Sequence, residues 1–462
     1  MRKYLNRLFF DLSLERYRIL EELQENQFTD YDTVKNLQKE KLLSLLRHSF
    51  EIPYYQKCFK SLGITHHALE TDNPLDILGK LPILSKDLVK ENYQDLCASD
   101  HQKRGSYINF TGGSTGVPTK FLQDHNYKEH EQAHNSLVYS WRGVDCFDSV
   151  FYIWGAARDM NKGFISSVKN FIRNRYYFNC FSLTEKNIRF CIKNLNTRKP
   201  ALIVAYADAI YEIAKYANEH NLFVEPQQAI HTGAGNLYDF MKEEIVKCFQ
   251  CKVFNHYGAR DSGSIASECV AQDGLHLMEL HQYVEILDDD NKLVSDGEEG
   301  KIVVTTLDNY SMPLIRYEIG DRGIKAPYKK CPCGCVFSKL QSVTGRSEDR
   351  VITPDGQYID SNFFVHFIGV ECNQTGDVKK FQVVQNKISE IEINIVPKKD
   401  VLDDTVKENI KNQIQGRLGS SIKVIINIVQ DITKTPTGKY RYVINHLYDQ
   451  NKKNFSVISS PK

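Results

Sequence analysis

The sequence predicts an α/β protein, built from a large N-terminal domain of several subdomains and a small, mobile α+β C-terminal domain. Three observations lead to this expectation. The chain has 462 residues, which is too long for one ordinary compact core. Short β-rich runs alternate with helical patterns between about Asn109 and Thr306, which is typical of a layered α/β architecture. After Gly345 the pattern changes to paired strand-like runs around a single helix-like run.

The individual elements follow from hydrophobic periodicity. Apolar residues recur mostly at spacings of three and four over residues 31–97, which indicates a helical N-terminal region punctuated by prolines. We expect residues 1–344 to form the N-terminal domain, with a small β subdomain at about 280–344, and residues 345–462 to form the C-terminal domain. The expected strands cover 151–154, 202–204, 284–287, 301–306, 314–317, 381–384, 391–396 and 422–428, and the expected helices cover 209–216, 239–249 and 406–418.

Bulk composition excludes several classes of partner. Lysine and arginine total 59 against 58 aspartate and glutamate, so no net charge favours nucleic acid or an acidic membrane surface. The apolar stretch Leu8-Phe9-Phe10 is broken by Asp11, so we expect neither a signal peptide nor stable membrane insertion. Twelve cysteines are too few for a disulfide scaffold of this length. We therefore expect a cytoplasmic protein with reduced cysteines and a small-molecule partner.

The most distinctive local pattern is a glycine- and hydroxyl-rich run over residues 109–120, NFTGGSTGVPTK, which follows a strand-like start. Glycines let a backbone approach a phosphate closely, and hydroxyl groups add donors. A surface turn has the same composition, so the run alone leaves both interpretations open. It is not a Walker loop, because no Gly-Lys-Ser/Thr closes it. The candidate phosphate-binding residues are Thr111, Gly112, Gly113, Ser114, Thr115 and Gly116.

This run resembles the phosphate loop of the adenylate-forming superfamily, which comprises acyl-CoA synthetases, luciferases and adenylation domains of peptide synthetases. Here Thr119 follows the proline and the lysine falls one position later, at Lys120, as in the phenylacetate-CoA ligase branch. Within that branch the sequence resembles CapK-type proteins, named for capsular polysaccharide gene clusters. The likeness extends from Pro53 to Lys439.

Two further blocks are similar to family motifs in the same order. The run 231–235 resembles the segment whose backbone lines the adenine, and 255–261 resembles the block ending in Tyr-Gly-x-Thr/Ser-Glu. The resemblance implies that the final acid, here Asp261, helps to hold Mg²⁺ on the triphosphate, a role that suits a carboxylate oxygen. Arg260 stands where the family has a small hydroxyl residue. The implied nucleotide-binding residues are Gly233, Ala234, Gly235, His256, Tyr257 and Gly258.

The remaining motifs lie toward the C-terminus. By resemblance, Asp321 accepts hydrogen bonds from both ribose hydroxyls, Arg346 approaches the ribose and phosphate, and Glu348 is the hinge between domains. Lys439 resembles the lysine that reaches the α-phosphate and the acid during adenylation. Six motifs therefore follow one another in the family's order. They imply an AMP-forming, ATP-dependent activation of a carboxylic acid.

The chemistry explains the residue types. A carboxylate must displace pyrophosphate from the α-phosphorus although both reactants are anions, so fixed donors and cations must offset the charge. Mg²⁺ at Asp261, the loop donors Thr111, Ser114 and Thr115, and Lys439 are the expected catalytic set. No general base is needed, because the attacking carboxylate is already ionised near neutral pH.

Cysteines crowd together in Cys331-Pro-Cys333-Gly-Cys335, and Cys269 and His276 precede them. Thiolate and imidazole are the ligands of closed structural zinc sites. Many members of the phenylacetate-CoA ligase branch carry this Cys, Gly-x-His and Cys-x-Cys-Gly arrangement. We expect a structural zinc ion on Cys269, His276, Cys331 and Cys333, while a cluster of inert thiols remains the alternative and the role of Cys335 is open.

Several alternatives stay open at this point. CoA is the default acyl acceptor. In the alternative interpretation, the acyl group is transferred to a carrier, or to a sugar amine or hydroxyl in capsule modification. A non-catalytic, zinc-stabilised relative is a third, and a homodimer is neither required nor excluded. His130 and His134 have helical spacing, and we expect them on a partly exposed helix rather than at a metal. The identity of the acid does not follow from the sequence.

Overall fold

The computed structural model describes residues 14–111, 118–145, 147–155, 164–181, 183–359, 361–368, 377–399, 401–433 and 440–447. The chain divides into two compact units. The first contains residues 1–319 and 323–343, and the second contains residues 320–322 and 344–462. Each unit is described by itself below. Among the described residues, no helix combines the length and the apolar character that crossing a membrane requires.

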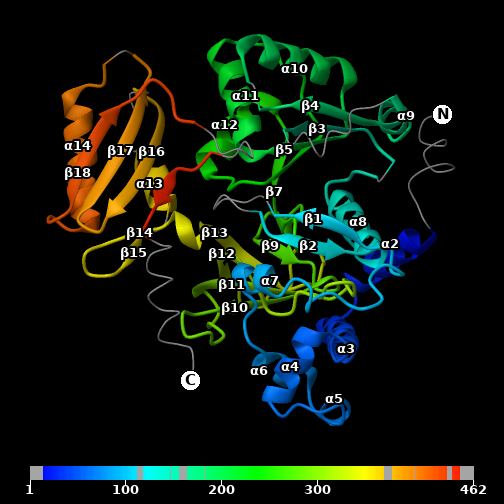
Figure 1. Cartoon of the computed structure of the whole chain (residues 1–462). Helices are drawn as coiled ribbons and strands as arrows, with labels where there is room; N and C mark the ends of the chain where they lie inside the picture. The colour runs from blue at the N-terminus through cyan, green and yellow to red at the C-terminus, as the bar shows by residue number, and fades with distance from the viewer. Residues whose placement is uncertain are drawn as a thin grey trace. The chain divides into compact units, whose positions relative to one another are not determined.

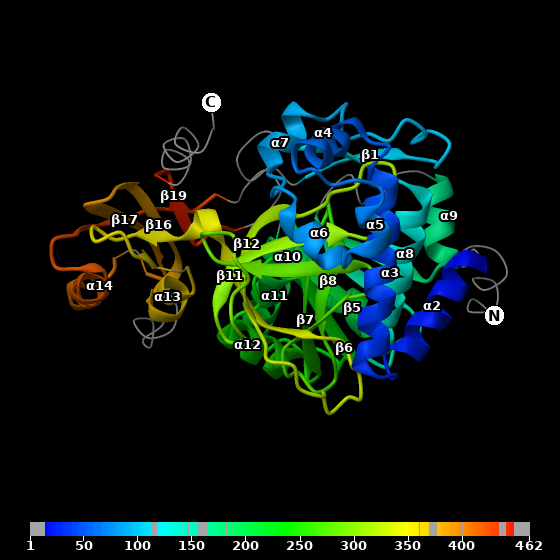
Figure 2. The same cartoon turned by 90° about the horizontal axis from the view of Figure 1, so that it is seen from below.

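The first unit begins with a run of helices. Their N-termini are set by side-chain caps: Asp30 accepts a hydrogen bond from the Thr33 amide, and Ser85 accepts one from the Leu88 amide. One face of these helices is buried in a core that includes Leu42 and Leu45. Figure 2 shows α3 beside α2, and α2 packs along α8. The helices are α2 (Leu14–Asn26), α3 (Tyr31–Ser49), α4 (Pro53–Ser61), α5 (Ala68–Thr71), α6 (Pro74–Lys80) and α7 (Lys86–Glu91).

An eleven-stranded mixed sheet has the order β10-β11-β12-β13-β9-β8-β7-β6-β5-β3-β4. The strands β4-β3-β5-β6-β7 run parallel, and their connections include helices that gather around this half of the sheet (Figure 1). β5 and β6 are completely buried, as strands covered on both faces should be. The elements are β3 (Val150–Trp154), α9 (Phe164–Ile172), β4 (Arg175–Asn179), α10 (Glu185–Arg198), β5 (Leu202–Tyr206), α11 (Ala207–Glu219), β6 (Ala229–Gly233), α12 (Asp239–Phe249) and β7 (Lys252–Ala259).

The other half of the sheet contains antiparallel pairs such as β7-β8, β8-β9 and β10-β11. The expected strand over 314–317 is wrong: residues 315–316 form a turn, and the strand starts at Tyr317. The reason is local, because Arg316 adopts a left-handed φ of 51° that no strand accepts. The elements are β8 (Gly263–Glu268), β9 (Leu275–Leu277), β10 (Gln282–Leu287), β11 (Glu299–Thr306), β12 (Tyr317–Lys325) and β13 (Lys339–Arg346).

A separate antiparallel hairpin, β1 (Tyr107–Phe110) and β2 (Lys120–Gln123), carries the glycine-rich run in its loop. α8 (His125–Ser140) follows β2 directly. Its cap, Asp124, accepts hydrogen bonds from the Tyr127 amide at 2.9 Å and, through its other oxygen, from the amides of Tyr310 and Ser311 at 3.0 and 2.9 Å. This buried carboxylate therefore fixes both the hairpin and the helix against the segment after β11.

The second unit contains a four-stranded sheet in the order β18-β17-β16-β19. The β16-β17 pair is antiparallel, and β18 and β19 add to it in parallel. α14 buries Ile410, Ile414 and Leu418, which recur at helical spacing. The elements are η1 (Ser347–Asp349), β14 (Val351–Ile352), β15 (Tyr358–Ile359), α13 (Ser361–His366), β16 (Val378–Lys387), β17 (Glu390–Pro397), α14 (Asp404–Leu418), β18 (Lys423–Ile428) and β19 (Val443–Asn445).

Candidate active site and metal centre

The base of the glycine-rich loop is closed by two hydrogen bonds between Thr111 and Thr119. The Thr111 amide donates to the Thr119 carbonyl at 2.9 Å, and the Thr119 amide donates to the Thr111 hydroxyl at 2.9 Å. The side chain of Thr111 therefore holds the two ends of the loop together. Gly112, Gly113, Ser114, Thr115 and Gly116 lie outside the described residues, so their expected phosphate contacts remain predictions.

Asp261 lies in the turn between β7 and β8 and is buried. The hydroxyl of Tyr317 donates a hydrogen bond to its Oδ2 at 2.7 Å. The Nε2 atom of Gln123 donates to the Arg260 carbonyl at 2.9 Å, which ties the loop hairpin to the residue before Asp261. The structure thus connects the expected magnesium ligand to the hairpin that carries the expected phosphate loop. The contacts of the described residues do not explain why an arginine stands at position 260, where the family motif has a small hydroxyl residue.

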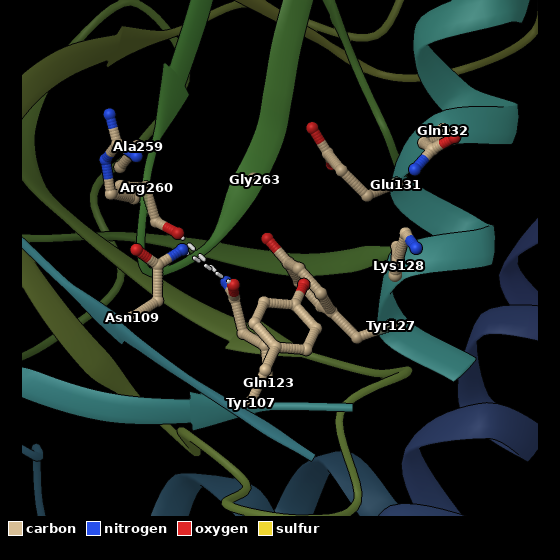
Figure 3. Close-up of a pocket in the computed structure, with 10 residues that line it drawn as sticks. All are labelled: Tyr107, Asn109, Gln123, Tyr127, Lys128, Glu131, Gln132, Ala259, Arg260 and Gly263. Carbon is tan, nitrogen blue, oxygen red and sulfur yellow. Dashed lines mark hydrogen bonds between the residues drawn. The ribbon is translucent and has the colours of Figure 1, made fainter. Parts of the chain in front are cut away.

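A cavity of about 470 Å³ lies between α8, the β1-β2 hairpin and the β7-β8 turn (Figure 3). Its wall from α8 carries Tyr127 and Glu131, whose side chains extend from the helix toward the strands. The sequence had given no indication of this cavity, because its wall comes from three separate segments. The lining residues are Tyr107, Asn109, Gln123, Tyr127, Lys128, Glu131, Gln132, Ala259, Arg260 and Gly263.

The expected adenine-lining run 231–235 begins on β6, and the motif 255–261 begins on the neighbouring parallel strand β7; the two strands are in register at His231 and Phe254. The rings of His231 and His256 lie 4.6 Å apart, centre to centre. Burial and, to a smaller extent, the nearby Arg142 guanidinium lower the pKa of His256 to about 4, so its imidazole is neutral at pH 7. Gly233 ends β6, and Ala234 after it has a φ of 61°, so the backbone turns sharply there. Gly235 follows this turn.

Tyr257 is buried and Gly258 follows it on β7. A Cβ atom at Gly258 would lie 2.7 Å from the Gly263 carbonyl oxygen across the hairpin. Only glycine fits this close approach, which explains the residue without any reference to a ligand. The position of Gly258 in the motif therefore has a structural reason of its own.

The second unit brings together three of the expected residues. The Nε atom of Arg346 lies 3.7 Å from an oxygen of Asp321, and its Nη1 atom lies 3.2 Å from an oxygen of Glu348. Asp349, next to Glu348, pairs with Arg441. Burial raises the pKa of Asp349 to about 6, although Arg441 opposes this shift. Lys439 lies outside the described residues, so its expected role in adenylation stays a prediction.

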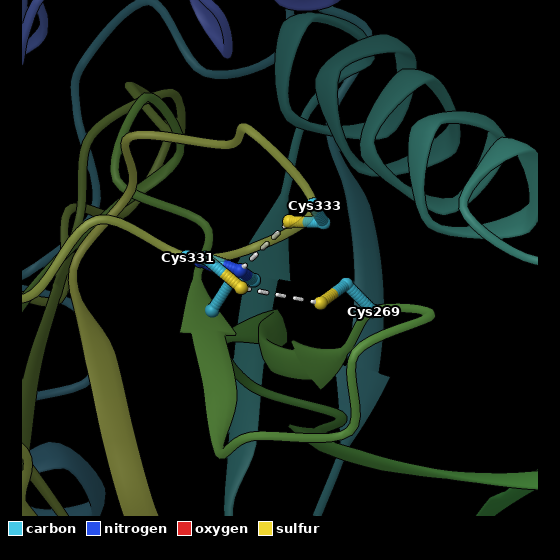
Figure 4. Close-up of side chains that lie close together, drawn as sticks. Cys269, Cys331 and Cys333 are labelled. Atoms are coloured by element: carbon cyan, nitrogen blue, oxygen red, sulfur yellow. Dashed lines mark hydrogen bonds between the residues drawn. The ribbon is translucent and has the colours of Figure 1, made fainter.

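Cys269, His276, Cys331 and Cys333 come together in the first unit, with their candidate ligand atoms all within 4.8 Å of one another. Figure 4 shows the three cysteines converging from two separate segments. Cys269 follows β8, His276 lies on β9, and the two other cysteines lie between β12 and β13. Cys335 does not join the cluster; its backbone amide donates to the Cys333 sulfur at 3.4 Å.

The distances in this cluster fit a tetrahedral zinc ion. Zinc–sulfur bonds of about 2.3 Å and zinc–nitrogen bonds of about 2.0 Å place two ligand sulfurs about 3.8 Å apart and a sulfur and a nitrogen about 3.5 Å apart. The Cys269 and Cys331 sulfurs are 3.7 Å apart, and the Cys333 sulfur is 3.5 Å from His276 Nε2. The other ring nitrogen of His276 lies 2.9 Å from the Phe337 carbonyl, to which it donates in the tautomer that leaves Nε2 for a metal.

A buried chain of charged groups lies behind the cavity wall and was missed in the sequence. His281 is fully buried; its Nδ1 atom is 2.8 Å from Asp308 and its Nε2 atom 3.3 Å from Glu131. Lys41 lies 2.7 Å from the other oxygen of Asp308. Burial alone would lower the pKa of His281, but hydrogen bonds and the charges of Asp308 and Glu131 raise it above its ordinary value. No spacing rule connects four residues so distant in the chain.

The α8 histidines lie on a partly exposed helix, as expected, but on its covered face. His134 is fully buried, and its ring centre lies 4.9 Å from that of His281. Burial lowers the pKa of His130 to about 3 although Asp308 lies 3.4 Å away. Helical spacing placed the two histidines on one face, but only packing against β9 and the following segment determined that this face is covered.

Comparisons with known proteins agree with this fold. Residues 351–446 match the CapK C-terminal domain family. Protein CapK of Staphylococcus aureus is 24% identical over 445 residues, covering 90% of each chain. A phenylacetate-coenzyme A ligase of Thermus thermophilus is 20% identical over 462 residues, covering 90% of this chain and 97% of the ligase. A crystal structure of 2-hydroxyisobutyryl-CoA ligase with 2-HIB-AMP in the postadenylation state superposes with a TM-score of 0.71 at 17% identity, covering 95% of this chain and 94% of the ligase.

The chain is therefore similar in sequence to CapK and to phenylacetate-coenzyme A ligases, and its fold matches that of acyl-CoA ligases of the adenylate-forming superfamily.

Proposed function

We propose that the protein is an ATP-dependent, AMP-forming ligase that converts a carboxylic acid to its acyl-adenylate and passes the acyl group to CoA. The observation that supports this most strongly is the hydrogen bond from Gln123 to the Arg260 backbone at 2.9 Å. It holds the turn of Asp261 against the hairpin whose loop starts at Thr111. A buried carboxylate tied to the hairpin that carries the glycine- and hydroxyl-rich sequence supports a magnesium–triphosphate as the ligand.

The chemistry assigns separate tasks to these residues. A carboxylate oxygen forms a bond to the α-phosphorus, the bond from that phosphorus to the bridging oxygen breaks, and pyrophosphate leaves. Asp261 would hold Mg²⁺, which offsets the charge of the phosphates. The hydroxyl of Thr111 accepts from the Thr119 amide and so keeps the two ends of the loop together. Lys439 would supply the remaining positive charge.

In the second unit, Asp321 would accept hydrogen bonds from the ribose hydroxyls. Arg346 supports this assignment, because its Nε atom lies 3.7 Å from Asp321 Oδ1 and so helps to orient the carboxylate. Arg346 also contacts Glu348, the proposed hinge. When the backbone rotates at a hinge residue, the side-chain contacts of that residue must break and form again. A half-buried ion pair such as Arg346–Glu348 breaks at modest cost.

We also propose a structural role for zinc at Cys269, His276, Cys331 and Cys333. Four protein ligands leave no open position for water or substrate, which is the arrangement of a structural site. The metal would join the β8-β9 connection to the segment between β12 and β13. That segment leads into β13 and so to Arg346.

The test is ATP–pyrophosphate exchange with a panel of carboxylic acids, followed by the same reactions with CoA added. We expect acid-dependent exchange, and a loss of roughly 10²-fold in Lys439→Ala, which is the usual cost of removing one well-placed charged donor. Exchange without any CoA-thioester product would favour the alternative, transfer to a non-CoA acceptor. No exchange with any acid would contradict the proposal and favour a non-catalytic relative.

A further inference from the structure

The turn between β7 and β8 carries Asp261, and side chains from separate segments bind the backbone on both sides of this residue. Gln123 of β2 donates to the Arg260 carbonyl at 2.9 Å. Gln282, which is fully buried at the start of β10, donates to the Ser262 carbonyl. Both chain neighbours of Asp261 are therefore held in place by residues that are distant in the sequence.

Glu131 of α8 supplies a third contact to this segment, at the start of β8. Its Oε2 atom accepts a hydrogen bond from the Ser264 amide at 2.8 Å, and Figure 3 shows its side chain extending from α8 toward Gly263. A Cβ atom at Gly263 would collide with this oxygen, and Gly263 has a φ of 77°, so the backbone approaches the carboxylate as closely as a glycine permits. Hydrogen bonds to an ionised acceptor are stronger than those between neutral groups.

The other contacts of Glu131 fix its orientation. Asn135 donates to its Oε1 atom at 2.8 Å, and the Nε2 atom of His281 lies 3.3 Å from its Oε2 atom. The Nδ1 atom of His281 lies 2.8 Å from Asp308, and Lys41 lies 2.7 Å from the other oxygen of Asp308. Breaking a contact within such a largely buried chain of charged groups is costly, because it leaves a charge without its partner. The carboxylate of Glu131 is therefore held toward the turn.

The protonation state of Glu131 suits this task. Burial would raise the pKa of Glu131, but the contact with His281 and the hydrogen bonds from Ser264 and Asn135 hold it below its ordinary value. The carboxylate is thus ionised near neutral pH, so both of its oxygens accept hydrogen bonds.

A second buried glutamate on the same helix offers a comparison. Glu129 pairs with Arg16 of α2 at 2.9 and 3.0 Å. This ion pair fastens α8 to α2. Glu131 has the same chemistry and lies two residues later, but its carboxylate binds the backbone three residues after Asp261. The two glutamates therefore separate the stabilisation of α8 from the positioning of the turn.

We propose that Glu131 and His281 are positioning residues for Asp261: Glu131 holds the β7-β8 turn through the Ser264 amide, and His281 holds Glu131. The inference rests on the proposed function, because both residues act through Asp261 on the same Mg²⁺. Neither side chain touches the ion or the substrate in this role. They fix the direction of the Asp261 carboxylate before the ion binds, which reduces the cost of ordering it during binding.

The first test needs no activity. Hydrogen exchange of the full chain without nucleotide, followed by mass spectrometry, compares Glu131→Gln with its matched control Glu129→Gln. We expect exchange in peptides covering residues 262–266 to be about tenfold faster in Glu131→Gln, because the Ser264 amide loses a charged acceptor. Exchange in α10 is the reference for global unfolding. Equal exchange of residues 262–266 in the two variants would overturn the inference.

The second test uses two substitutions of His281 and the Mg²⁺ dependence of ATP–pyrophosphate exchange. Both His281→Gln and His281→Asn remove the buried ring. A glutamine places its amide nitrogen near the Nε2 position and can contact Glu131, whereas an asparagine places it near Nδ1 and can contact only Asp308. We expect His281→Asn to need about tenfold more Mg²⁺ for half-maximal exchange than His281→Gln, with similar rates at saturating Mg²⁺. Equal Mg²⁺ requirements would overturn the inference, since a purely structural histidine affects both variants alike.

The same titration separates this inference from the proposed function. Glu131→Gln should raise the Mg²⁺ concentration for half-maximal exchange about tenfold, and Glu129→Gln should leave it unchanged. An equal Mg²⁺ requirement in these two variants, with exchange intact, would overturn the inference alone. Absence of exchange with every acid in the unmodified protein would overturn the proposed function and, with it, the action on Mg²⁺.

Discussion

The hydroxyl of Tyr317 donates a hydrogen bond to Asp261 Oδ2 at 2.7 Å, and this contact joins two sequence motifs that lie 56 residues apart. Tyr317 begins β12 and is fully buried, so its hydroxyl has a fixed direction. The hydrogen bond orients the carboxylate. The predictions that follow begin with this pair.

Asp261→Asn should raise the Mg²⁺ concentration needed for half-maximal pyrophosphate exchange and lower the maximal rate by roughly 10²-fold, because an amide oxygen is a neutral and weaker ligand. Tyr317→Phe should raise the Mg²⁺ requirement less, since it removes only the orienting hydrogen bond. The control is Asp87→Asn on the exposed face of α7. An unchanged Mg²⁺ titration in Asp261→Asn would remove this residue from the metal site.

Asp321→Ala should weaken ATP binding, because two hydrogen bonds to a charged acceptor are each worth roughly 1.5 to 3 kcal/mol. Calorimetric titration with ATP measures this directly. Asp431→Ala is the control, since its ion pair with Lys380 lies at the surface and is worth little. The affinity for ATP is divided by the affinity for 2′-deoxy-ATP, once for Asp321→Ala and once for the unmodified protein. If the two ratios are equal, Asp321 does not contact the 2′-hydroxyl of the ribose.

Protein purified without a chelator should contain about one zinc ion per chain by elemental analysis. Cys333→Ser should lose the metal, while Cys58→Ser, in the same unit but outside the cluster, should keep it. Removal of zinc should lower the melting temperature by about 5 °C or more, since a tightly bound ion stabilises only the folded state. Cys335→Ser should retain zinc, because Cys335 is not among the four candidate ligands and a serine keeps the backbone amide that donates to the Cys333 sulfur. Full zinc content in Cys269→Ser combined with Cys333→Ser would exclude the site.

His256 should contribute to acid denaturation. Its pKa falls from 6.5 to about 4 in the folded protein, chiefly through burial. The unfolded state therefore binds an additional proton between these pH values, so stability decreases as the pH falls, by at most about 1.4 kcal/mol per pH unit. His256→Gln should flatten the pH dependence of the unfolding free energy in this window, measured by urea denaturation. His67→Gln, at an exposed residue, should not. An unchanged slope in His256→Gln would show that His256 stays accessible to protons.

The sequence by itself determined the fold class and most of the elements. Helix α12 begins at Asp239 and ends at Phe249, as its periodicity predicts. Its apolar residues recur at helical spacing, so a helix places them all on the one face that is buried. The resemblance to adenylate-forming enzymes, drawn from ordered motifs, is confirmed by the relatives and the fold. The order of the motifs indicates the fold because each motif requires particular residue types at its own place in the backbone.

Tertiary structure decided what lies between those motifs. The turn at Arg316 was missed because its left-handed φ accompanies a buried ion pair with Glu285, 31 residues away, which local sequence does not encode. The cavity wall and the Lys41–Asp308–His281–Glu131 chain were missed for the same reason: contacts between distant segments depend on packing, not on spacing. The four zinc-ligand candidates could be named from the sequence because residue type restricts metal chemistry. Only the fold could bring their ligand atoms within 4.8 Å of one another.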